Sequence, residues 1–427
     1  MNYENLSPLL QDTAGRYPEI PPVLLLKIDA ILRGVRASER AEALAKGNGF
    51  IWETVNGDKR KYYVDGVIFP DGLSLEKPKF PGETSQHRDK AIFSPGTVSY
   101  LIDEIDGQFW LTDDGKPIER LFFSPIPQFF GKKTSRGTPM ENIAESLPSS
   151  CLSLVPYGYC YFWNEKIPCK YCNLIGDLIT GIKSSQTDET LQEITETVTE
   201  ALKEEGRWQI FRLHAGSDPR GGVAYDKETE EYIKVLGAVE KAFGSKDFNG
   251  RFVGSALNKD QWKRTKEAGN SAVEPHIEVW DKRLFDIICP GKAKWNGYDY
   301  WLQSALDAVD VFGRGNVCSQ VVGGIELAKP YGFGTIDEAL DSTLAGVEFF
   351  AERGVTMSFN VLRVRNPSVF YKEGQAPPSV EYYARLATGM HKIRKKHRIP
   401  VGFNDYRRCS AHPDTILSRL DYPQATL

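Results

Sequence analysis

From residue 150 to about residue 400, short apolar runs alternate with longer segments in which apolar residues recur at helical spacing. This alternation is typical of βαβ units and of a parallel sheet. We expect six strands, at 151–156, 209–215, 248–256, 272–280, 317–325 and 355–364, and six crossover helices, at 187–205, 227–243, 259–268, 298–312, 336–353 and 380–397. Because such units wind right-handed, six of them curve into most of a barrel, with active groups at the carboxyl ends of the strands.

The region before this series has a different pattern, which predicts an α+β arrangement. A helix is expected over residues 21–46, and turn residues predict two hairpins, 50–54 with 61–69 and 98–105 with 108–112. Residues from 402 onward show no clear period and are expected to fold over one end of the barrel. The predicted fold is therefore α/β, a partial (β/α)6 TIM-like barrel at 146–400 with an N-terminal α+β extension at 1–145 and a short C-terminal cap at 401–427.

Composition and charge limit the classes of partner that we expect for this chain. The 427 residues have a formal net charge of −4 and no long run of Lys or Arg, so we expect no nucleic-acid partner. The N-terminus lacks a basic segment followed by an apolar one, and Lys27 and Asp29 interrupt the apolar stretch 23–32, which predicts an amphipathic helix. We expect a cytoplasmic protein with no membrane partner and a small-molecule substrate.

Cysteines give the most specific chemical signal. Their number, seven, is odd, and three of them, Cys160, Cys169 and Cys172, follow the first predicted strand, which favours metal or redox use over a disulfide framework. Three thiolates leave one iron of a four-iron cluster open to bind a small molecule. A closed structural zinc site would need four ligands.

Two alternatives for these cysteines stay open. Cys151 could join the three in a four-cysteine zinc site, since Cys169-x-x-Cys172 has the spacing of a zinc knuckle. Eight residues separate Cys151 from Cys160, however, and Cys151 begins a strand that is expected to be buried. A redox dithiol at Cys169 and Cys172 would leave Cys160 unused. The corresponding functions are a zinc-stabilised binding protein without catalysis and a thiol oxidoreductase.

The Cys-x-aromatic-Cys segment, with Tyr171 as its aromatic residue, resembles the cluster motif of the radical S-adenosylmethionine (radical SAM) enzymes. That family usually has three residues between the first two cysteines and two between the last, whereas this chain has eight and two. An enlarged cluster loop that includes Phe162 and Trp163 is the simpler account of the difference. The resemblance implies a 4Fe-4S cluster on Cys160, Cys169 and Cys172, with S-adenosylmethionine at the open iron.

Later strand ends extend the resemblance over about residues 151–367. The segment after the second strand resembles the family's Gly-Gly-Glu-type segment, which meets the methionine amino group. The end of the fourth strand resembles the position that holds the ribose hydroxyls, and the fifth resembles the adenine-contacting segment of the biotin-synthase-like branch. The sixth lies where the family contacts adenine and substrate. The implied cofactor-binding residues are Gly216, Ser217 and Asp218, then Glu278, then Gly323 and Gly324, then Arg363. A surface carboxylate at Glu278 and a tight bend at Gly323-Gly324 are the alternatives.

The resemblance implies reductive cleavage of S-adenosylmethionine to a 5′-deoxyadenosyl radical that takes a hydrogen atom from a small, anionic metabolite, in lyase, rearrangement or carbon–carbon bond chemistry. It also implies oxygen sensitivity and an external one-electron donor such as flavodoxin or ferredoxin. Two catalytic candidates lie in a predicted loop over the barrel mouth: Cys289 could return a hydrogen atom, and Lys292 could bind a carboxylate or phosphate. An ordinary cysteine and a solvated charge are the alternatives. His214 and His276 are expected to be core or loop residues.

Overall fold

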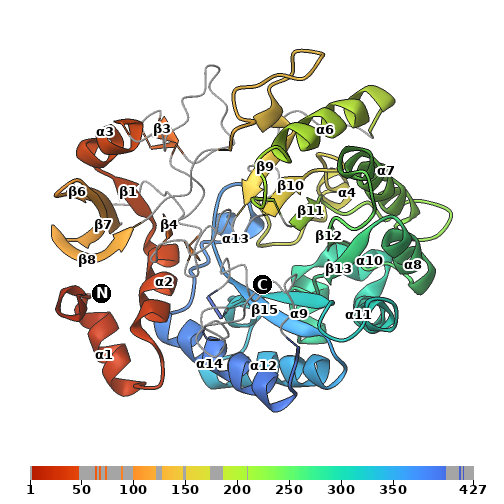
Figure 1. Cartoon of the computed structure of the whole chain (residues 1–427). Coiled ribbons are helices and arrows are strands. Elements are labelled where there is room, and N and C mark those ends of the chain that lie inside the picture. Colours follow the sequence, from red (N-terminus) through yellow and green to blue (C-terminus); the bar gives the residue numbers. More distant parts are fainter. Residues whose placement is uncertain are drawn as a thin grey trace.

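The structure is a computed structural model. It describes residues 2–47, 100–121, 127–147, 151–173, 186–208 and 210–400, with the short stretches 63–64, 67–68, 73–74, 88–89 and 413–414 and residue Leu417. A curved sheet with helices around its outside forms the larger part, and a smaller α+β part lies beside it (Figure 1). Within these ranges, no helix combines the length and the apolar character needed to cross a membrane.

The central sheet keeps the order of the sequence. Its strands are β9 (Ala144–Leu147), β10 (Cys151–Leu154), β11 (Ile210–His214), β12 (Gly250–Gly254), β13 (Asn270–Pro275), β14 (Cys318–Gly323) and β15 (Thr356–Val361). Strands β10 to β13 pair in parallel, β9 pairs antiparallel with β10, and β14 pairs in parallel with β15. Two isolated bridges, Val273 with Val317 and Glu278 with Val321, join β13 to β14. Among the described residues β15 does not pair back to β9, so the sheet is a partial barrel.

All six predicted strands are present, although β13 ends at Pro275, earlier than expected. The six predicted crossover helices are confirmed as α6 (Asp188–Ala201), α7 (Asp226–Phe243), α8 (Lys259–Glu267), α11 (Gly297–Phe312), α12 (Ile336–Glu352) and α14 (Val380–Lys396). Side-chain capping boxes at Thr187, Asn258 and Thr335 start three of them. The amphipathic pattern and the local caps therefore both specify these helices.

The region predicted as a loop over the barrel mouth is helical, which corrects the sequence prediction. Helix α9 (Lys282–Ile288) and helix α10 (Pro290–Trp295) follow β13, and Cys289 stands between them. Asp281 caps α9 by accepting a hydrogen bond from the Leu284 backbone N–H, and Pro290 starts α10. Two further short helices, α4 (Tyr161–Asn164) and α13 (Val369–Lys372), lie after β10 and β15. The turns η1 (Tyr3–Asn5), η2 (Met140–Asn142) and η3 (Ile325–Leu327) are 3₁₀.

In the N-terminal part, the single helix predicted over 21–46 is wrong. Helix α2 (Pro22–Arg33) ends at Gly34, whose φ of +81° is a left-handed conformation that glycine adopts without strain. Strand β1 (Val35–Ala37) and helix α3 (Glu39–Gly47) follow, and α1 (Pro8–Arg16) precedes α2. The chain leaves the helix here because Val35 joins a sheet edge, pairing with Tyr100.

The later of the two predicted hairpins is confirmed by β6 (Tyr100–Ile105) and β7 (Gln108–Asp113), and β8 (Lys116–Leu121) extends their sheet. For the earlier hairpin, residues 50–54 lie outside the described residues. Within 61–69 a short hairpin forms instead, from β2 (Tyr63–Val64) and β3 (Val67–Ile68), and β4 (Leu73–Ser74) pairs with β5 (Arg88–Asp89).

The N-terminal part packs on the barrel through α1 and α2. Helix α2 contacts α14 and β15. Glu381 at the start of α14 pairs with Arg16 at 2.8 Å and accepts a hydrogen bond from the Tyr17 hydroxyl at 2.5 Å. Of the predicted C-terminal cap, only three residues are described: buried Asp414 pairs with Arg394 at 2.6 Å, and Leu417 packs into the core. These contacts fix α14, the last helix of the barrel, from both sides.

Candidate functional site

The first cysteine of the predicted motif meets the glycine loop after β11. Cys160 lies at the N-terminus of α4, and Gly216 packs so closely on it that a Cβ built on Gly216 would lie 2.4 Å from the Cys160 Cβ. The Tyr161 backbone N–H also donates to the Ser217 carbonyl oxygen at 2.8 Å. The structure therefore brings the predicted cluster cysteine and the predicted S-adenosylmethionine loop into direct contact at the carboxyl edge of the sheet.

Hydrogen-bond donors contact two sulfur atoms of the cysteine loop (residues 160–172), those of Cys160 and Cys172. Burial raises the pKa of Cys160, and backbone N–H groups of Ser217, Trp163 and Phe162 act in the opposite direction. The Trp163 indole N–H donates to the Cys172 sulfur at 3.5 Å. Such donors stabilise negative charge on sulfur, as iron–sulfur sites require. The donor set therefore fits metal-bound thiolates.

Cys169 contacts a fourth cysteine. Its side chain shares a hydrogen bond with Cys289, and this bond together with burial raises the pKa of Cys169. Cys289 is fully buried between α9 and α10. It therefore lies beside Cys169, and its return of a hydrogen atom to a product stays a prediction.

Segments after β13 and β15 hold the cysteine loop in place. The Lys170 backbone N–H donates to Ile288 and the Phe370 N–H donates to Lys170, each at 2.8 Å. A Cβ on Gly291 would lie 2.4 Å from the Phe162 ring, so α10 packs directly under the loop. Helix α4 occupies part of the eight-residue spacing between Cys160 and Cys169. The enlarged loop is thus an ordered, docked element.

Cys151 is remote from these cysteines. It packs against Ile210 at the amino ends of β10 and β11, apart from the main core. Ile210 to His214 alone spans roughly 13 Å along a strand, and Cys160 lies beyond the carboxyl end. Zinc–sulfur bonds of about 2.3 Å cannot bridge such a distance. The zinc site that includes Cys151 is therefore wrong.

Glu278 and Lys292 form a pair at the end of β13. Lys292 is buried, and its ammonium donates to Glu278 Oε1 at 2.9 Å and to the His276 carbonyl at 2.8 Å. It also lies 3.9 Å from the centre of the Trp301 ring. The observed role of Lys292 is to hold the Glu278 carboxylate, and its contact with substrate stays a prediction.

Asp218 is engaged by its neighbours. The carboxylate is fully buried and accepts hydrogen bonds from Arg220 Nε and Nη2, both at 2.7 Å, and from the Tyr159 hydroxyl at 2.6 Å. Burial acts to raise the pKa of Asp218, but these hydrogen bonds outweigh it and lower the pKa. Asp218 therefore fixes the loop. The Gly216 carbonyl accepts from the Tyr157 hydroxyl at 2.6 Å and the Ser217 carbonyl from the Tyr161 N–H, so each keeps one lone pair for a further donor. Binding of an ammonium group by this loop stays a prediction.

Glu228, which the sequence analysis missed, ties this loop to the next strand. Its fully buried carboxylate accepts from the Asp218 N–H at 2.9 Å, the Ser255 N–H at 2.9 Å and the Ser255 hydroxyl at 2.8 Å. Burial raises its pKa to about 7. In the sequence Glu228 is one of several charged residues in the first turn of α7 and gives no signal of burial.

The two glycines at the end of β14, Gly323 and Gly324, allow close packing. A Cβ on Gly324, whose φ is +97°, would lie 2.5 Å from the Pro378 ring, and the Tyr383 hydroxyl donates to the Gly323 carbonyl at 3.0 Å. These contacts favour the tight-bend alternative, and the adenine contact stays a prediction. Arg363 follows β15 at the same edge, half-buried, and its role also stays a prediction.

The inner face of the barrel is polar, which the sequence analysis also missed. Hydrogen bonds and ion pairs run from strand to strand on this face: Ser153 to His214 at 2.9 Å, Arg251 to Glu274 at 3.2 Å, Glu274 to Gln320 at 3.4 Å and Gln320 to Asn360 at 2.7 Å. Alternate residues face outward, and Phe211, Phe252 and Phe359 pack on helices α7, α8 and α14. The signal was the polar residues that alternate with apolar ones in these strands, such as Arg212 and His214 in β11, since a parallel strand covered on both faces is normally apolar throughout. His214 and His276 belong to this polar face.

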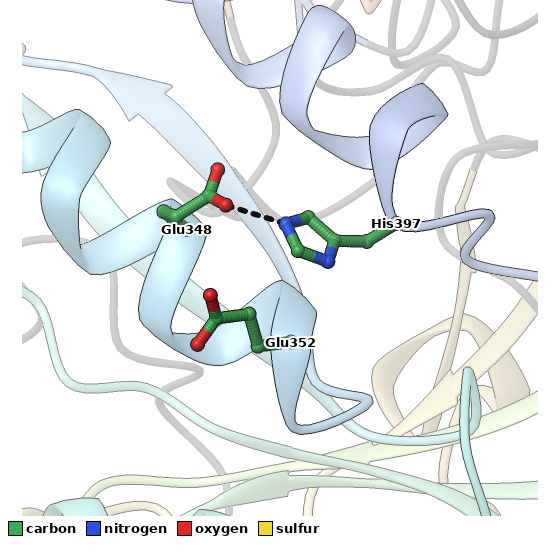
Figure 2. Close-up of side chains that lie close together, drawn as sticks. All are labelled: Glu348, Glu352 and His397. Carbon is green, nitrogen blue, oxygen red and sulfur yellow. Dashed lines mark hydrogen bonds and ion pairs between the residues drawn. The ribbon is translucent and has the colours of Figure 1, made fainter.

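Three further potential metal ligands cluster at the opposite end of the barrel. Glu348, Glu352 and His397 lie near one another where α12 and α14 end (Figure 2). Glu348 Oε1 is already paired with His397 at 2.6 Å and with Lys396 at 2.5 Å, and Glu352 is paired with Arg353 at 3.2 Å. This cluster is an ion-pair network that joins the two helices.

No family model matches the chain, and no curated protein is significantly similar to it. Among solved structures, the hydrogenase maturase HydG from Carboxydothermus hydrogenoformans is 14% identical with a TM-score of 0.41, over 57% of this chain and 51% of that chain. A radical SAM methyltransferase from Sphaerobacter thermophilus is 13% identical with a TM-score of 0.41, over 75% and 82%. Methylornithine synthase (PylB) is 14% identical with a TM-score of 0.39, over 63% and 78%. The chain thus spans about half the length of the HydG chain it matches.

Proposed function

We propose that the chain is a radical SAM enzyme that binds a 4Fe-4S cluster through Cys160, Cys169 and Cys172. The observation that carries the proposal is the contact between Gly216 and Cys160, because a ligand on an open iron would lie beside the loop that is expected to bind its amino group. Such a cluster, when bound, supplies the electron that cleaves S-adenosylmethionine to a 5′-deoxyadenosyl radical.

The chain's own residues would bind and orient the cluster and S-adenosylmethionine and shield them from water. Backbone N–H groups and the Trp163 indole stabilise the thiolates. The carbonyls of Gly216 and Ser217 accept from the ammonium group, and Glu278, held by Lys292, accepts from the ribose hydroxyls. Docking of the cysteine loop on α10 and α13 would limit the access of water to the site.

The remaining parts of the proposal concern substrate and partners. The substrate is a small anionic metabolite, and the reaction is of the lyase, rearrangement or carbon–carbon bond class. An external one-electron donor such as flavodoxin or ferredoxin supplies the electron, and the site is oxygen-sensitive. The buried position of Cys289 against Cys169 favours a role beside the metal site over return of a hydrogen atom to a product radical.

Anaerobic reconstitution with iron and sulfide, followed by dithionite and S-adenosylmethionine, tests the proposal. We expect cluster absorbance and formation of 5′-deoxyadenosine, both lost in Cys160→Ala, Cys169→Ala and Cys172→Ala. Cys151→Ala is the matched control, since Cys151 lies at the other end of the sheet. Absence of 5′-deoxyadenosine from the wild-type protein contradicts the proposal. Bound zinc without cluster absorbance would instead support a zinc-stabilised protein, and activity that survives Cys160→Ala would support a thiol oxidoreductase.

A further inference from the structure

We propose that Arg212 and Arg251 form an oxyanion-binding site inside the barrel, which takes a carboxylate or phosphate group of the substrate. This inference deepens the proposed function by naming the recognition group of the substrate, and it rests on that function only for the reaction that follows binding.

The two arginines are neighbours on one face. Arg212 of β11 is the register partner of Arg251 of β12 in a parallel pair. Register partners point to the same side of a sheet, and neighbouring strands are about 4.8 Å apart. Like charges placed side by side in this way are destabilising. The arrangement therefore favours a negatively charged ligand.

Among the described residues, only one of the two guanidinium groups has an acidic partner. Arg251 is buried and pairs with Glu274, which is also contacted by Gln320 and lies 3.6 Å from His276. Arg212 is half-buried, and its guanidinium group makes no hydrogen bond or ion pair in the described part of the chain. A partly desolvated cation without a counterion is costly. A bound oxyanion would remove this cost.

Solvent reaches the face on which these arginines lie. Inward-facing His214, His276 and Asn360 near the carboxyl ends of the strands are half-buried, whereas outward-facing Phe211 and Phe252 are covered by helices. Arg212 is two residues deeper than His214, about 7 Å along the strand. A ligand entering from the cysteine-loop side would therefore place its anionic end deep in the barrel.

Further polar groups line the same interior. Ser358 is the register partner of Gln320, and its fully buried hydroxyl has no hydrogen-bond partner among the described residues. Glu145, an acid on the same face, is the register partner of Ser153 on the far side from Arg212, two strands or about 10 Å away. No ion pair joins it to Arg212 among the described residues. The predicted ligand is a small, polar molecule with one oxyanion group.

Ligand titration with simple probes tests the site without knowledge of the substrate. Acetate represents a carboxylate, inorganic phosphate and methyl phosphate represent a phosphate, and glycerol is the neutral control. We expect saturable thermal stabilisation of the full-length protein by acetate or by the phosphates, and a loss of affinity of at least about tenfold in Arg212→Gln. The exposed Arg353→Gln is the matched control and should bind like the wild type. Equal binding by Arg212→Gln and the wild type, or equal stabilisation by glycerol, overturns the inference.

A second measurement covers the case in which Arg212→Gln does not fold. Phenylglyoxal modifies arginine side chains, and mass spectrometry of the wild-type protein measures modification at Arg212. We expect protection of Arg212 by the anion that binds, and no protection by glycerol. Unchanged modification overturns the inference. Neither measurement requires a cluster, so anion binding at Arg212 without formation of 5′-deoxyadenosine would contradict only the proposed function.

Discussion

Gly216 and Cys160 lie so close together that a single methyl group would not fit between them. A Cβ on Gly216 would lie 2.4 Å from the Cys160 Cβ and 2.4 Å from the Tyr159 carbonyl oxygen. The Tyr159 carbonyl oxygen belongs to the backbone, and the Cys160 Cβ is attached directly to it. Neither atom can move aside without a shift of the cysteine loop. The position requires glycine for steric reasons, and it couples the loop after β11 to the first cysteine.

We therefore expect Gly216→Ala to displace Cys160 and to weaken cluster binding. Overpacking of this kind costs about 1–3 kcal/mol of unfolding free energy. Urea denaturation measures the stability, and iron content after reconstitution measures the cluster. Gly237→Ala in the middle of α7 is the control, because nothing lies within 4 Å of its Cβ position and alanine is the better helix former. Full iron content in Gly216→Ala would show that the contact is not needed.

Glu228 predicts a pH dependence of stability. Burial raises its pKa from 4.5 to about 7 in the folded protein, so folding favours the protonated form. Its contribution to stability is present below pH 4.5 and is lost as the pH rises towards 7, a change of about 3 kcal/mol. We expect Glu228→Gln to remove this loss. The measurement is unfolding free energy between pH 5 and pH 8, with the exposed Glu205→Gln as control. A Glu228→Gln profile parallel to the wild type would contradict the prediction.

Much of the fold was predictable because local and long-range signals agree. At Thr187 the capping residues start α6 where its apolar period begins, and the apolar run 151–156 gives β10 directly. The single helix at 21–46 failed for a tertiary reason: β1 is only three residues long and exists because it pairs with β6. The loop predicted around Cys289 failed because caps at Asp281 and Pro290 define helices too short to show a clear period.

Candidate site residues could be recognised where the spacing of residues along the sequence forms a motif. They could not be recognised where their role depends on tertiary contacts. The three cysteines and the loop at Gly216 were recognisable from order alone, and the structure packs the first of them, Cys160, against Gly216. Binding of a cluster by all three stays a prediction. Glu228 was not recognisable, because its buried carboxylate is stabilised by N–H donors of Asp218 and Ser255, which belong to two other segments. Arg212 could have been found from the alternation of apolar and polar residues in β11.

The pair of Lys292 and Glu278 predicts a large effect of removing one partner. Lys292→Met would leave the Glu278 carboxylate partly buried without its cation, at a cost of about 3–5 kcal/mol. The double variant Lys292→Met with Glu278→Gln has no unpaired charge and should recover part of the loss. Urea denaturation of the wild type and the three variants measures both effects. Additive losses in the double variant would show that the two side chains act independently.

The hydrogen bond from Trp163 to Cys172 predicts a shift in reduction potential. Donation of an N–H to a ligand sulfur favours the reduced, more negative cluster, so Trp163→Phe should make the midpoint potential of the reconstituted protein more negative. A bond worth about 1 kcal/mol corresponds to about 40 mV for a one-electron couple. A redox titration followed by electron paramagnetic resonance measures the shift, with Trp110→Phe on β7 as the control because it lies in the N-terminal sheet. An unchanged potential in Trp163→Phe would show that the indole N–H does not influence the cluster, since phenylalanine keeps an aromatic ring at this position and removes the donor.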